Sequence, residues 1–357
     1  MSRYLAERYQ GVSPYVPGEQ PGPGFVKLNA NETTMPPSPR VREALSDALV
    51  ESLGLYADPH ARPLKAAVAR ALGVDEESVF VGNGSDEVLG FLFLTTLEEG
   101  DALGFPDISY GFYRDYAATF GLAGMPVTLR DDFTLDVEGF RQFKGAVVFA
   151  NPNAPTGLAV SPDDVRRIAE ADPDRLVVVD EAYIDYGAET CVPLVRECPN
   201  VVVVQTFSKS RNLAGAHIGF AIGAPELVSN MEDIRFSFNP FSVSALTQAV
   251  GAAAVEDKDY LQQCVAQVTR ERARLADALA QRGFQVLPSQ TNFLFVHHPA
   301  FKGDELCDQL RRRAVLIRHF DQPRIRDWNR ITVGTAQEND ALLAALDDAL
   351  GEAIGVH

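Results

Sequence analysis

Three apolar runs separated by helical segments place the strongest constraint on how this chain folds. Residues 146–150, 176–179 and 201–204 are apolar at every position, as is the shorter run 79–81. Strands without polar alternation are typical of a parallel sheet that helices cover on both faces. A helix start is expected at 161–164, where a serine and a proline precede two acidic residues. The alternation predicts a doubly wound, mostly parallel α/β sheet.

The pattern changes near residue 240, which predicts a second and smaller domain. Residues 241–283 look mainly helical, and strand-like segments follow at 291–296, 315–318 and 330–334. An amphipathic helix is expected from about residue 337. This mixture predicts an α+β domain rather than a continuation of the parallel sheet.

The segment 11–24 is rich in glycine and proline, which predicts an extended arm rather than a helix. Low-complexity disorder is the alternative, although Tyr15 gives this segment a side chain that can dock. We therefore expect an N-terminal arm at 1–30, a large domain at 31–245 and a small C-terminal domain at 246–357.

Charge and cysteine content narrow the class of protein. The formal net charge of −17 disfavours nucleic acids and anionic membrane surfaces as partners, because both bind basic patches. Four cysteines without Cys-x-x-Cys spacing are expected to be free thiols in a reducing cytoplasm. The first residues lack the apolar core of a signal peptide, and no apolar stretch approaches the ~20 residues of a membrane span. We expect a cytoplasmic protein with small-molecule ligands.

Lys209 is the most informative single residue. It follows the apolar run 201–204, at the edge where open α/β sheets bind their ligands. A lysine that is desolvated there can lose its proton and react with the carbonyl group of a cofactor. Most lysines at strand ends are solvated surface residues, so this interpretation depends on the other segments at the same edge.

Two loops at this edge have sequences suited to a ligand. Gly82-Asn83-Gly84-Ser85-Asp86-Glu87 lies between a strand and a helix, where glycine permits close approach and a helix N-terminus favours phosphate. Ser85 or Asp86 is the expected N-cap, and an ordinary turn is an equally good interpretation. Asn151-Pro152-Asn153-Ala154-Pro155-Thr156-Gly157 is a rigid turn whose asparagine could donate a hydrogen bond to a ligand, or could be purely structural.

Asp180 ends the apolar run 176–179, so its carboxylate should be partly buried and needs a partner. The protonated ring nitrogen of a cofactor would be such a partner, and the ring would then act as an electron sink. Tyr183 could reach the same ring, and Tyr110 could stack on it. The alternatives are that Asp180 caps the next helix and that Tyr110 belongs to the core.

Arg318 and Arg330 adjoin two strands of the predicted second domain. A charge beside a buried strand is costly unless it is paired. A substrate carboxylate or phosphate could pair with these side chains through bidentate hydrogen bonds. A surface salt bridge is the alternative for each arginine.

Taken in order, these segments resemble the fold-type-I pyridoxal-phosphate aminotransferases, and most closely the histidinol-phosphate aminotransferase family. The matching segments run from Tyr15-Val16-Pro17-Gly18, through Leu28-Asn29-Ala30-Asn31-Glu32, to Arg330-Ile331-Thr332-Val333-Gly334-Thr335. The resemblance covers nearly the whole chain in the family's order and at close to its spacings. It implies a large domain with a mostly parallel, seven-stranded sheet flanked by helices, a smaller α+β domain, and pyridoxal 5′-phosphate as cofactor.

The resemblance also implies roles for individual residues. Lys209 would bind the cofactor covalently and move protons, Asp180 would pair with its ring nitrogen, and Tyr183 would contact its phenolic oxygen. Tyr56 would reach the cofactor phosphate from a partner subunit, which implies a homodimer with shared sites. No metal is expected. The implied cofactor-binding set is Tyr56, Gly84, Ser85, Asp86, Tyr110, Asn153, Asp180, Tyr183, Ser208, Lys209 and His217, and the substrate-binding set is Tyr15, Asn31, Arg318 and Arg330.

Two positions depart from the family pattern. Ala154 replaces the second asparagine of Asn-Asn-Pro-Thr-Gly, which leaves Asn153 as the asparagine nearest to Pro-Thr-Gly. His217 stands eight residues after Lys209, where the family has an arginine that binds the cofactor phosphate. Histidine lacks the fixed fork of arginine and is charged only when protonated. The alternative is a neutral packing role for His217, with Arg211 or a water taking over the phosphate.

The resemblance implies transamination of histidinol phosphate with 2-oxoglutarate, which yields imidazole acetol phosphate and glutamate in histidine biosynthesis. An aromatic amino-acid aminotransferase, or a decarboxylase acting on threonine phosphate, would use the same cofactor residues. A non-catalytic cofactor-binding protein is a further alternative, against which the intact lysine, aspartate and tyrosine argue.

Overall fold

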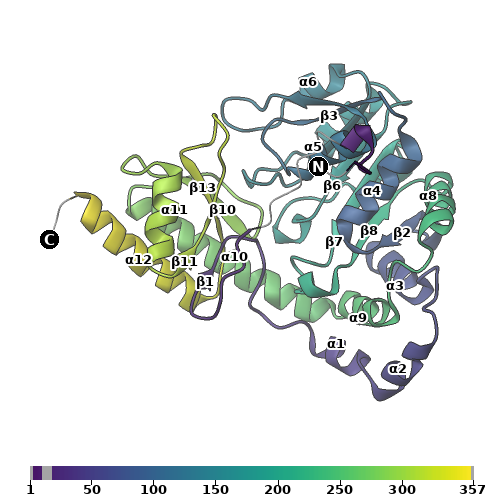
Figure 1. Ribbon diagram of the computed structural model, residues 1–357, viewed down its shortest axis with the longest axis horizontal. Helices are drawn as coiled ribbons and strands as arrows, with labels where there is room; N and C mark the ends of the chain where they lie inside the picture. Colours follow the sequence, from purple (N-terminus) through teal and green to yellow (C-terminus); the bar gives the residue numbers. More distant parts are fainter. Residues whose placement is uncertain (1–2, 10–17, 355–357) are drawn as a thin grey trace.

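The structure, a computed structural model, describes residues 3–9 and 18–354, so the predicted substrate residue Tyr15 lies outside it. Figure 1 shows a large domain built on a central sheet and a smaller domain that ends in the long helix α12 (Ala336–Ile354). Of the helices in these two ranges, none is both long and apolar enough to cross a membrane.

The large domain is built on a seven-stranded sheet in the order β2-β8-β7-β6-β5-β3-β4. All neighbours pair in parallel except β8, which runs antiparallel to both β2 and β7. The predicted fold class, a mostly parallel seven-stranded sheet with helices, is therefore confirmed. The strands are β2 (Val79–Gly82), β3 (Ala102–Pro106), β4 (Ala123–Val127), β5 (Ala146–Ala150), β6 (Val177–Asp180), β7 (Val201–Thr206) and β8 (Gly219–Ile222).

Helices cover both faces of this sheet, which explains why its central strands are apolar throughout. Along β5, Val147 and Phe149 belong to one buried cluster and Val148 to the other. The helices of the first cluster are α3 (Arg62–Leu72), α6 (Val137–Gln142), α7 (Pro162–Glu170) and α9 (Ala245–Glu256). Those of the second are α4 (Gly84–Thr96), α5 (Phe112–Phe120) and α8 (Pro225–Phe238).

Two predicted helix starts had different outcomes. Ser161 caps α7, because its side chain accepts a 3.1 Å hydrogen bond from the backbone nitrogen of Asp164. The prediction that Ser85 or Asp86 caps α4 is wrong. Asn83 is the N-cap, without a side-chain bond, and the Glu87 carboxylate accepts from its backbone nitrogen at 2.6 Å. In this bond the backbone of the N-cap residue donates to a side chain of the helix, rather than the N-cap side chain accepting from the helix backbone.

The small domain contains an antiparallel sheet in the order β12-β13-β10-β9. In a separate two-stranded sheet, β1 near the start of the chain pairs in parallel with β11. The strands are β1 (Val26–Lys27), β9 (Gln285–Val286), β10 (Phe293–His297), β11 (Val315–Leu316), β12 (Arg318–His319) and β13 (Trp328–Thr332). Its helices are α10 (Lys258–Gln281), α11 (Gly303–Arg312) and α12.

The remaining helices connect these parts. The helix α9 packs against α3 and against α1 (Pro39–Ala44), whereas α10 continues toward β9 and α12. The division of the chain at residue 245 stays a prediction. The shorter helices are α2 (Asp47–Glu51) and the 3-10 turns η1 (Glu7–Tyr9), η2 (Ser52–Gly54), η3 (Glu76–Ser78), η4 (Ile184–Tyr186), η5 (Val192–Arg196) and η6 (Ala214–Ala216).

Candidate active site

A cavity of about 370 Å³ lies at the edge where the parallel strands of the large domain end and the small domain begins. It brings together most of the residues that the sequence singles out. They are Asn31, Gly84, Ser85, Asp86, Tyr110, Asp180, Tyr183, Ser208, Lys209, His217, Arg318 and Arg330. Because the carboxyl ends of parallel strands share one edge, segments far apart in the chain meet here.

Asp180 and Lys209 come from neighbouring strands. Asp180 is the last residue of β6 and pairs in register with Val204 of β7, after which the chain continues to Lys209. The Lys209 Nζ atom lies 5.8 Å from the centre of the Tyr183 ring. The cavity therefore places an amine, a carboxylate and a phenol side by side.

The Asp180 carboxylate is only 4% exposed and accepts two hydrogen bonds. The Tyr113 hydroxyl donates to Oδ2 at 2.8 Å, and the backbone nitrogen of Ala182 donates to Oδ1 at 3.2 Å. Burial raises the pKa of Asp180 to about 6, although the Tyr113 hydrogen bond opposes this shift. The Ala182 bond closes a local turn and does not cap the next helical turn, η4, whose N-cap is Tyr183. The buried carboxylate is therefore still suited to a cationic partner.

Tyr113 is a site residue that the sequence argument missed. It is fully buried, and its desolvation together with the charge of Asp180 raises its pKa well above the ordinary range, so it remains a hydrogen-bond donor. Its distance of three residues from Tyr110 was the available signal. That spacing places both rings on one side of the chain as α5 begins, where they meet edge to face at 5.7 Å.

The Tyr183 hydroxyl is held by Asn31. The Asn31 side chain donates to it at 2.8 Å, and Asn31 is itself held by two hydrogen bonds with Thr332 of β13, at 2.9 and 3.2 Å. Because the Tyr183 oxygen accepts from Asn31, its own proton remains available for a ligand. This network ties the segment after β1, the end of β6 and the small-domain sheet to one point.

The start of α4 forms a tight cradle with the segment before β8. Gly84 has a φ of +82°, and a Cβ there would lie 2.6 Å from the His217 ring. A Cβ on Gly219 would lie 2.2 Å from the backbone nitrogen of Ser85. Only glycine fits either position, and the close packing directs the first amides of α4 and the His217 imidazole at the same space.

Two other charged side chains near this cradle, those of Arg211 and Asp86, already have partners within the protein. Arg211, which was the alternative phosphate ligand, forms a 3.0 Å ion pair with Asp185 and is not among the lining residues of the cavity. The Asp86 carboxylate accepts from the Tyr110 hydroxyl at 3.0 Å. Asp86 thus fixes the Tyr110 ring, and its backbone rather than its carboxylate suits an anion, since like charges repel.

Arg318 and Arg330 are directly opposite each other in the β12–β13 pair. Phe320 lies near both head groups, with its ring centre 5.9 Å from the Arg318 guanidinium and 5.5 Å from that of Arg330. Arg330 also donates to the backbone oxygen of Asn29 at 3.1 Å. In the described part of the chain no carboxylate forms an ion pair with Arg318, so a surface salt bridge does not explain it. Like charges facing each other across a sheet are unfavourable, and a bound anion would relieve this.

Two predicted residues lie outside the cavity lining. The Asn153 amide donates to Ile108 and Thr156 at 3.0 Å each and accepts from Ser109 at 2.8 Å, so both of its polar ends serve the loop. Ala154 and Pro155 line the cavity in its place, and a cofactor contact for Asn153 remains a prediction. Tyr56 is 84% exposed and stacks on Phe241 at 4.4 Å, away from the site of its own chain.

Other lining residues carried no sequence signal. Phe320 and Gln322 follow β12 in a segment without periodicity, and Thr206 and Ser109 are small polar residues of common types. Their positions result from tertiary contacts, which a local pattern does not encode.

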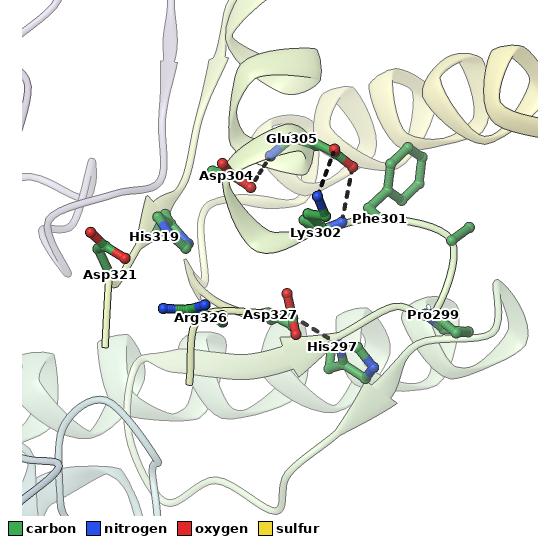
Figure 2. Close-up of a pocket in the computed structure, with 11 residues that line it drawn as sticks. His297, Pro299, Phe301, Lys302, Asp304, Glu305, His319, Asp321, Arg326 and Asp327 are labelled. Carbon is green, nitrogen blue, oxygen red and sulfur yellow. Dashed lines mark hydrogen bonds and ion pairs between the residues drawn. The ribbon is translucent and has the colours of Figure 1, made fainter. Parts of the chain in front are cut away.

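A larger cavity, of about 840 Å³, lies at the N-terminus of α11 (Figure 2). Four of its lining residues are carboxylates and two are cations, so acidic groups are in excess. Two backbone nitrogens at the helix start are already used: those of Lys302 and Glu305 donate to the side chains of Glu305 and Asp304 at 3.2 and 2.9 Å. None of the residues predicted from the sequence lines it. Its charged lining residues are His297, Lys302, Asp304, Glu305, His319, Asp321, Arg326 and Asp327. We therefore place the chemistry in the smaller cavity.

The family model for class I and II aminotransferases matches residues 23–346. The chain belongs to this family. Proteins named histidinol-phosphate aminotransferase are similar to this aminotransferase over its full length. The one from Aromatoleum aromaticum is 47% identical over 355 residues, covering 98% of this chain and 100% of that protein. The one from Acetobacter pasteurianus is 46% identical over 351 residues, covering 98% and 99%.

Solved structures agree with this assignment. The histidinol-phosphate aminotransferase of Sinorhizobium meliloti, determined in complex with pyridoxal 5′-phosphate, superposes on this aminotransferase with a TM-score of 0.89 at 28% identity, over 99% of both chains. A Thermus thermophilus aspartate aminotransferase variant shares the fold alone, with a TM-score of 0.82 at 21% identity over 97% of this chain and 98% of that one.

Proposed function

We propose that this aminotransferase uses pyridoxal 5′-phosphate to transfer the amino group of histidinol phosphate to 2-oxoglutarate, as a step of histidine biosynthesis. The observation that carries the proposal is that one cavity is lined by Asp180 and Lys209 of the large domain and by the Arg318–Arg330 pair of the small domain. Relatives of that name at 43–47% identity over nearly the whole chain support the choice of substrate.

The residues present fit this cofactor. A buried carboxylate such as Asp180 is stable in its charged form only beside a cation, which a protonated ring nitrogen would provide. The cradle of Gly84, Ser85, Ser208 and His217 suits the cofactor phosphate, because it combines the amides of a helix start with hydroxyl and imidazole donors. When bound, pyridoxal phosphate supplies an electron sink for the carbon from which the proton is removed.

The chain's own residues would then divide the work. Lys209 would hold the cofactor and would move the proton of the substrate carbon, as a positioned general base. Asp180 would keep the ring nitrogen protonated, with its carboxylate oriented by Tyr113. Tyr183, whose oxygen already accepts from Asn31, would donate a hydrogen bond to the phenolic oxygen of the cofactor.

The arginine pair explains how one site would serve both half-reactions. Histidinol phosphate carries a phosphate and 2-oxoglutarate carries carboxylates, so both present an oxyanion to Arg318 and Arg330. Guanidinium groups bind either anion through two parallel hydrogen bonds. A donor without an anionic group would leave the two positive charges facing each other.

Product analysis tests the substrate assignment. The loaded enzyme is mixed with 2-oxoglutarate and, in separate reactions, histidinol phosphate, an aromatic amino acid or threonine phosphate, and both glutamate and carbon dioxide are measured. Glutamate formed fastest from histidinol phosphate supports the proposal. Carbon dioxide from threonine phosphate, or faster turnover of the aromatic amino acid, refutes it. Borohydride reduction followed by peptide mapping checks the site, because the cofactor should be recovered on Lys209.

We further infer that the enzyme is a homodimer with shared sites. Leu55, Tyr56 and Phe238 are 77%, 84% and 79% exposed, and Phe241 stacks on Tyr56. Large apolar side chains gathered on one surface are typical of a protein interface. Covering this surface with a second copy would bury Tyr56 and allow it to reach the cofactor phosphate of the partner subunit.

We also infer a cytoplasmic location. Cys191, Cys198, Cys264 and Cys307 are all free, and the first three are buried. Free thiols in a folded protein are expected where glutathione and thioredoxin keep cysteines reduced.

A further inference from the structure

The connection 320–327 joins β12 and β13, the strands that carry Arg318 and Arg330, and it is anchored on the large domain, whereas β13 itself pairs with β10 of its own sheet. β12 is only two residues long, so few ladder hydrogen bonds fix the connection 320–327. Within this connection, Phe320 and Gln322 line the cavity. The position of the cavity wall therefore depends on what anchors the rest of the loop.

Arg324 is the main polar anchor. Its guanidinium forms a 2.7 Å ion pair with Asp107, which follows β3, and donates to the backbone oxygens of Leu129 and Arg130 at 3.0 Å each. It also lies 5.9 Å from the centre of the Phe133 ring. A planar guanidinium can reach three acceptors at once, which a lysine ammonium on a flexible stem does less well.

Asp107 connects this anchor to the cofactor end of the cavity. Its second carboxylate oxygen accepts from the backbone nitrogens of Ile108 and Leu129, at 3.0 and 2.8 Å. The chain from Ile108 continues through Ser109 to Tyr110, both of which line the cavity. One carboxylate thus fixes the loop before Tyr110 and, through Arg324, the loop that carries Phe320.

Ile325 adds an apolar anchor beside the polar one. It is 1% exposed and belongs to the buried cluster of the large domain, close to Phe133 and Trp328. Its backbone also closes two turns, from Ile325 to Gln322 at 3.0 Å and from Trp328 to Ile325 at 2.9 Å. With Ile325 holding the loop on the large domain, loss of Arg324 should shift the loop without unfolding it.

We propose that Arg324 is a positioning residue of the substrate-anion site: it holds the loop 320–327 on the large domain so that Arg318 and Arg330 face one anion with Phe320 beside both. Arg324 does not line the cavity, so its role is to act through this loop. Without the anchor, repulsion between the two opposed guanidinium groups separates them, and the anion loses its two-arginine site. The inference rests on the proposed function in one respect, namely that this pair binds the substrate anion.

Arg326 provides a matched control. It lies two residues away on the same loop, and it lines the larger cavity at the N-terminus of α11 (Figure 2). Across the described ranges its guanidinium forms no hydrogen bond or ion pair. Arg326→Ala therefore removes the same charge from the same loop without removing an anchor.

The test compares the variants Arg324→Ala, Arg324→Lys and Arg326→Ala with the wild type, each with pyridoxal 5′-phosphate bound. Two quantities are measured: the KM and kcat for histidinol phosphate, and the inhibition constant of inorganic phosphate against whichever amino donor the wild type uses. Arg324→Ala should raise the KM and the phosphate inhibition constant about three- to tenfold, the range expected for a mostly buried ion pair with two backbone hydrogen bonds. The kcat and the cofactor absorbance should stay within about twofold, Arg324→Lys should fall between, and Arg326→Ala should match the wild type.

A double-variant cycle identifies the partner. Asp107→Asn keeps an acceptor for Ile108 and Leu129 but loses the ion pair, so it should resemble Arg324→Ala, and the double variant should be no worse than either single one. The proposal is overturned if Arg324→Ala matches Arg326→Ala, if it lowers kcat or cofactor loading with the KM unchanged, or if phosphate does not inhibit the wild type. A wild type that ignores histidinol phosphate refutes the proposed function instead, and the phosphate measurement then decides the role of Arg324.

Discussion

The Tyr113 hydroxyl donates a 2.8 Å hydrogen bond to the Asp180 carboxylate, and both side chains are buried. Tyr113 belongs to α5, whereas Asp180 ends β6, so the bond joins a covering helix to the sheet edge. This bond and the one from the Ala182 backbone nitrogen do not offset the loss of solvent, and the pKa of Asp180 is raised from 3.8 to about 6. The site therefore stores an unfavourable negative charge that a cationic ligand would neutralise.

This relationship predicts how stability depends on pH. Because the pKa of Asp180 is raised on folding, the folded chain binds its proton more tightly, and this contribution to stability is complete below about pH 4 and lost as the pH rises through about 6. Asp180→Asn cannot titrate. The Tm of the cofactor-free wild type should thus fall relative to that of the variant between about pH 4 and 7, corresponding to at most about 3 kcal/mol.

Thermal unfolding of both cofactor-free proteins across this range checks the prediction. The same comparison with cofactor bound is the control, because a protonated ring nitrogen beside Asp180 should reduce the pH dependence. A Tm difference that stays constant from pH 4 to 7 in the cofactor-free proteins would show that burial does not perturb Asp180.

Arg330→Ala should weaken the binding of both substrates. If one anion site serves both half-reactions, the KM values for donor and for 2-oxoglutarate should rise together, by about ten- to a hundredfold for a loss of roughly 1.5–3 kcal/mol. Arg330→Lys keeps the charge but not the fork and should recover part of the loss. Steady-state kinetics with each substrate varied in turn is the measurement, and unchanged KM values for both would reassign Arg330 to a structural role.

The sequence predicted the central strands and the main site residues for one physical reason. Strands buried on both faces must be apolar, so β5, β6 and β7 were visible as unbroken apolar runs. Polar residues at their carboxyl ends must then share an edge, which placed Asp180 and Lys209 together. The same argument could not predict β4, an edge strand with mostly exposed residues, or β8, which begins with Gly219.

Contacts between distant segments were not accessible from the sequence. The bond from Tyr113 to Asp180 spans 67 residues and the ion pair from Arg324 to Asp107 spans 217, and neither has a local pattern. The N-cap of α4 was placed wrongly because the usual preference for a serine or aspartate cap gave way to Glu87, which reaches back to Asn83. Packing, rather than propensity, decided these positions.

His217 is expected to hold the cofactor phosphate in place of the family's arginine. His217→Ala should weaken cofactor binding, and His217→Arg should strengthen it, because the guanidinium is always charged and binds phosphate through two donors. Equilibrium dialysis of the cofactor against the wild type and the two variants measures this affinity. An affinity unchanged in His217→Ala would leave the imidazole a packing residue against Gly84.

Tyr56 provides a direct test of shared sites, because each site would take Lys209 from one subunit and Tyr56 from the other. Lys209→Ala should abolish turnover, and Tyr56→Ala should lower it when cofactor is limiting, since the phosphate loses a hydrogen bond of about 1 kcal/mol or more. If the two variants are mixed and allowed to exchange subunits, each mixed dimer contains one site with both Lys209 and Tyr56 intact. Activity at limiting cofactor should then exceed the average of the separate variants.

The control mixes Lys209→Ala with Asp180→Asn. Their mixed dimers contain no intact site if Asp180 acts within its own chain together with Lys209. Activity of the first mixture no higher than the average of its separate variants would place Tyr56 outside a shared site, and sedimentation of a monomer at assay concentration would remove the dimer altogether.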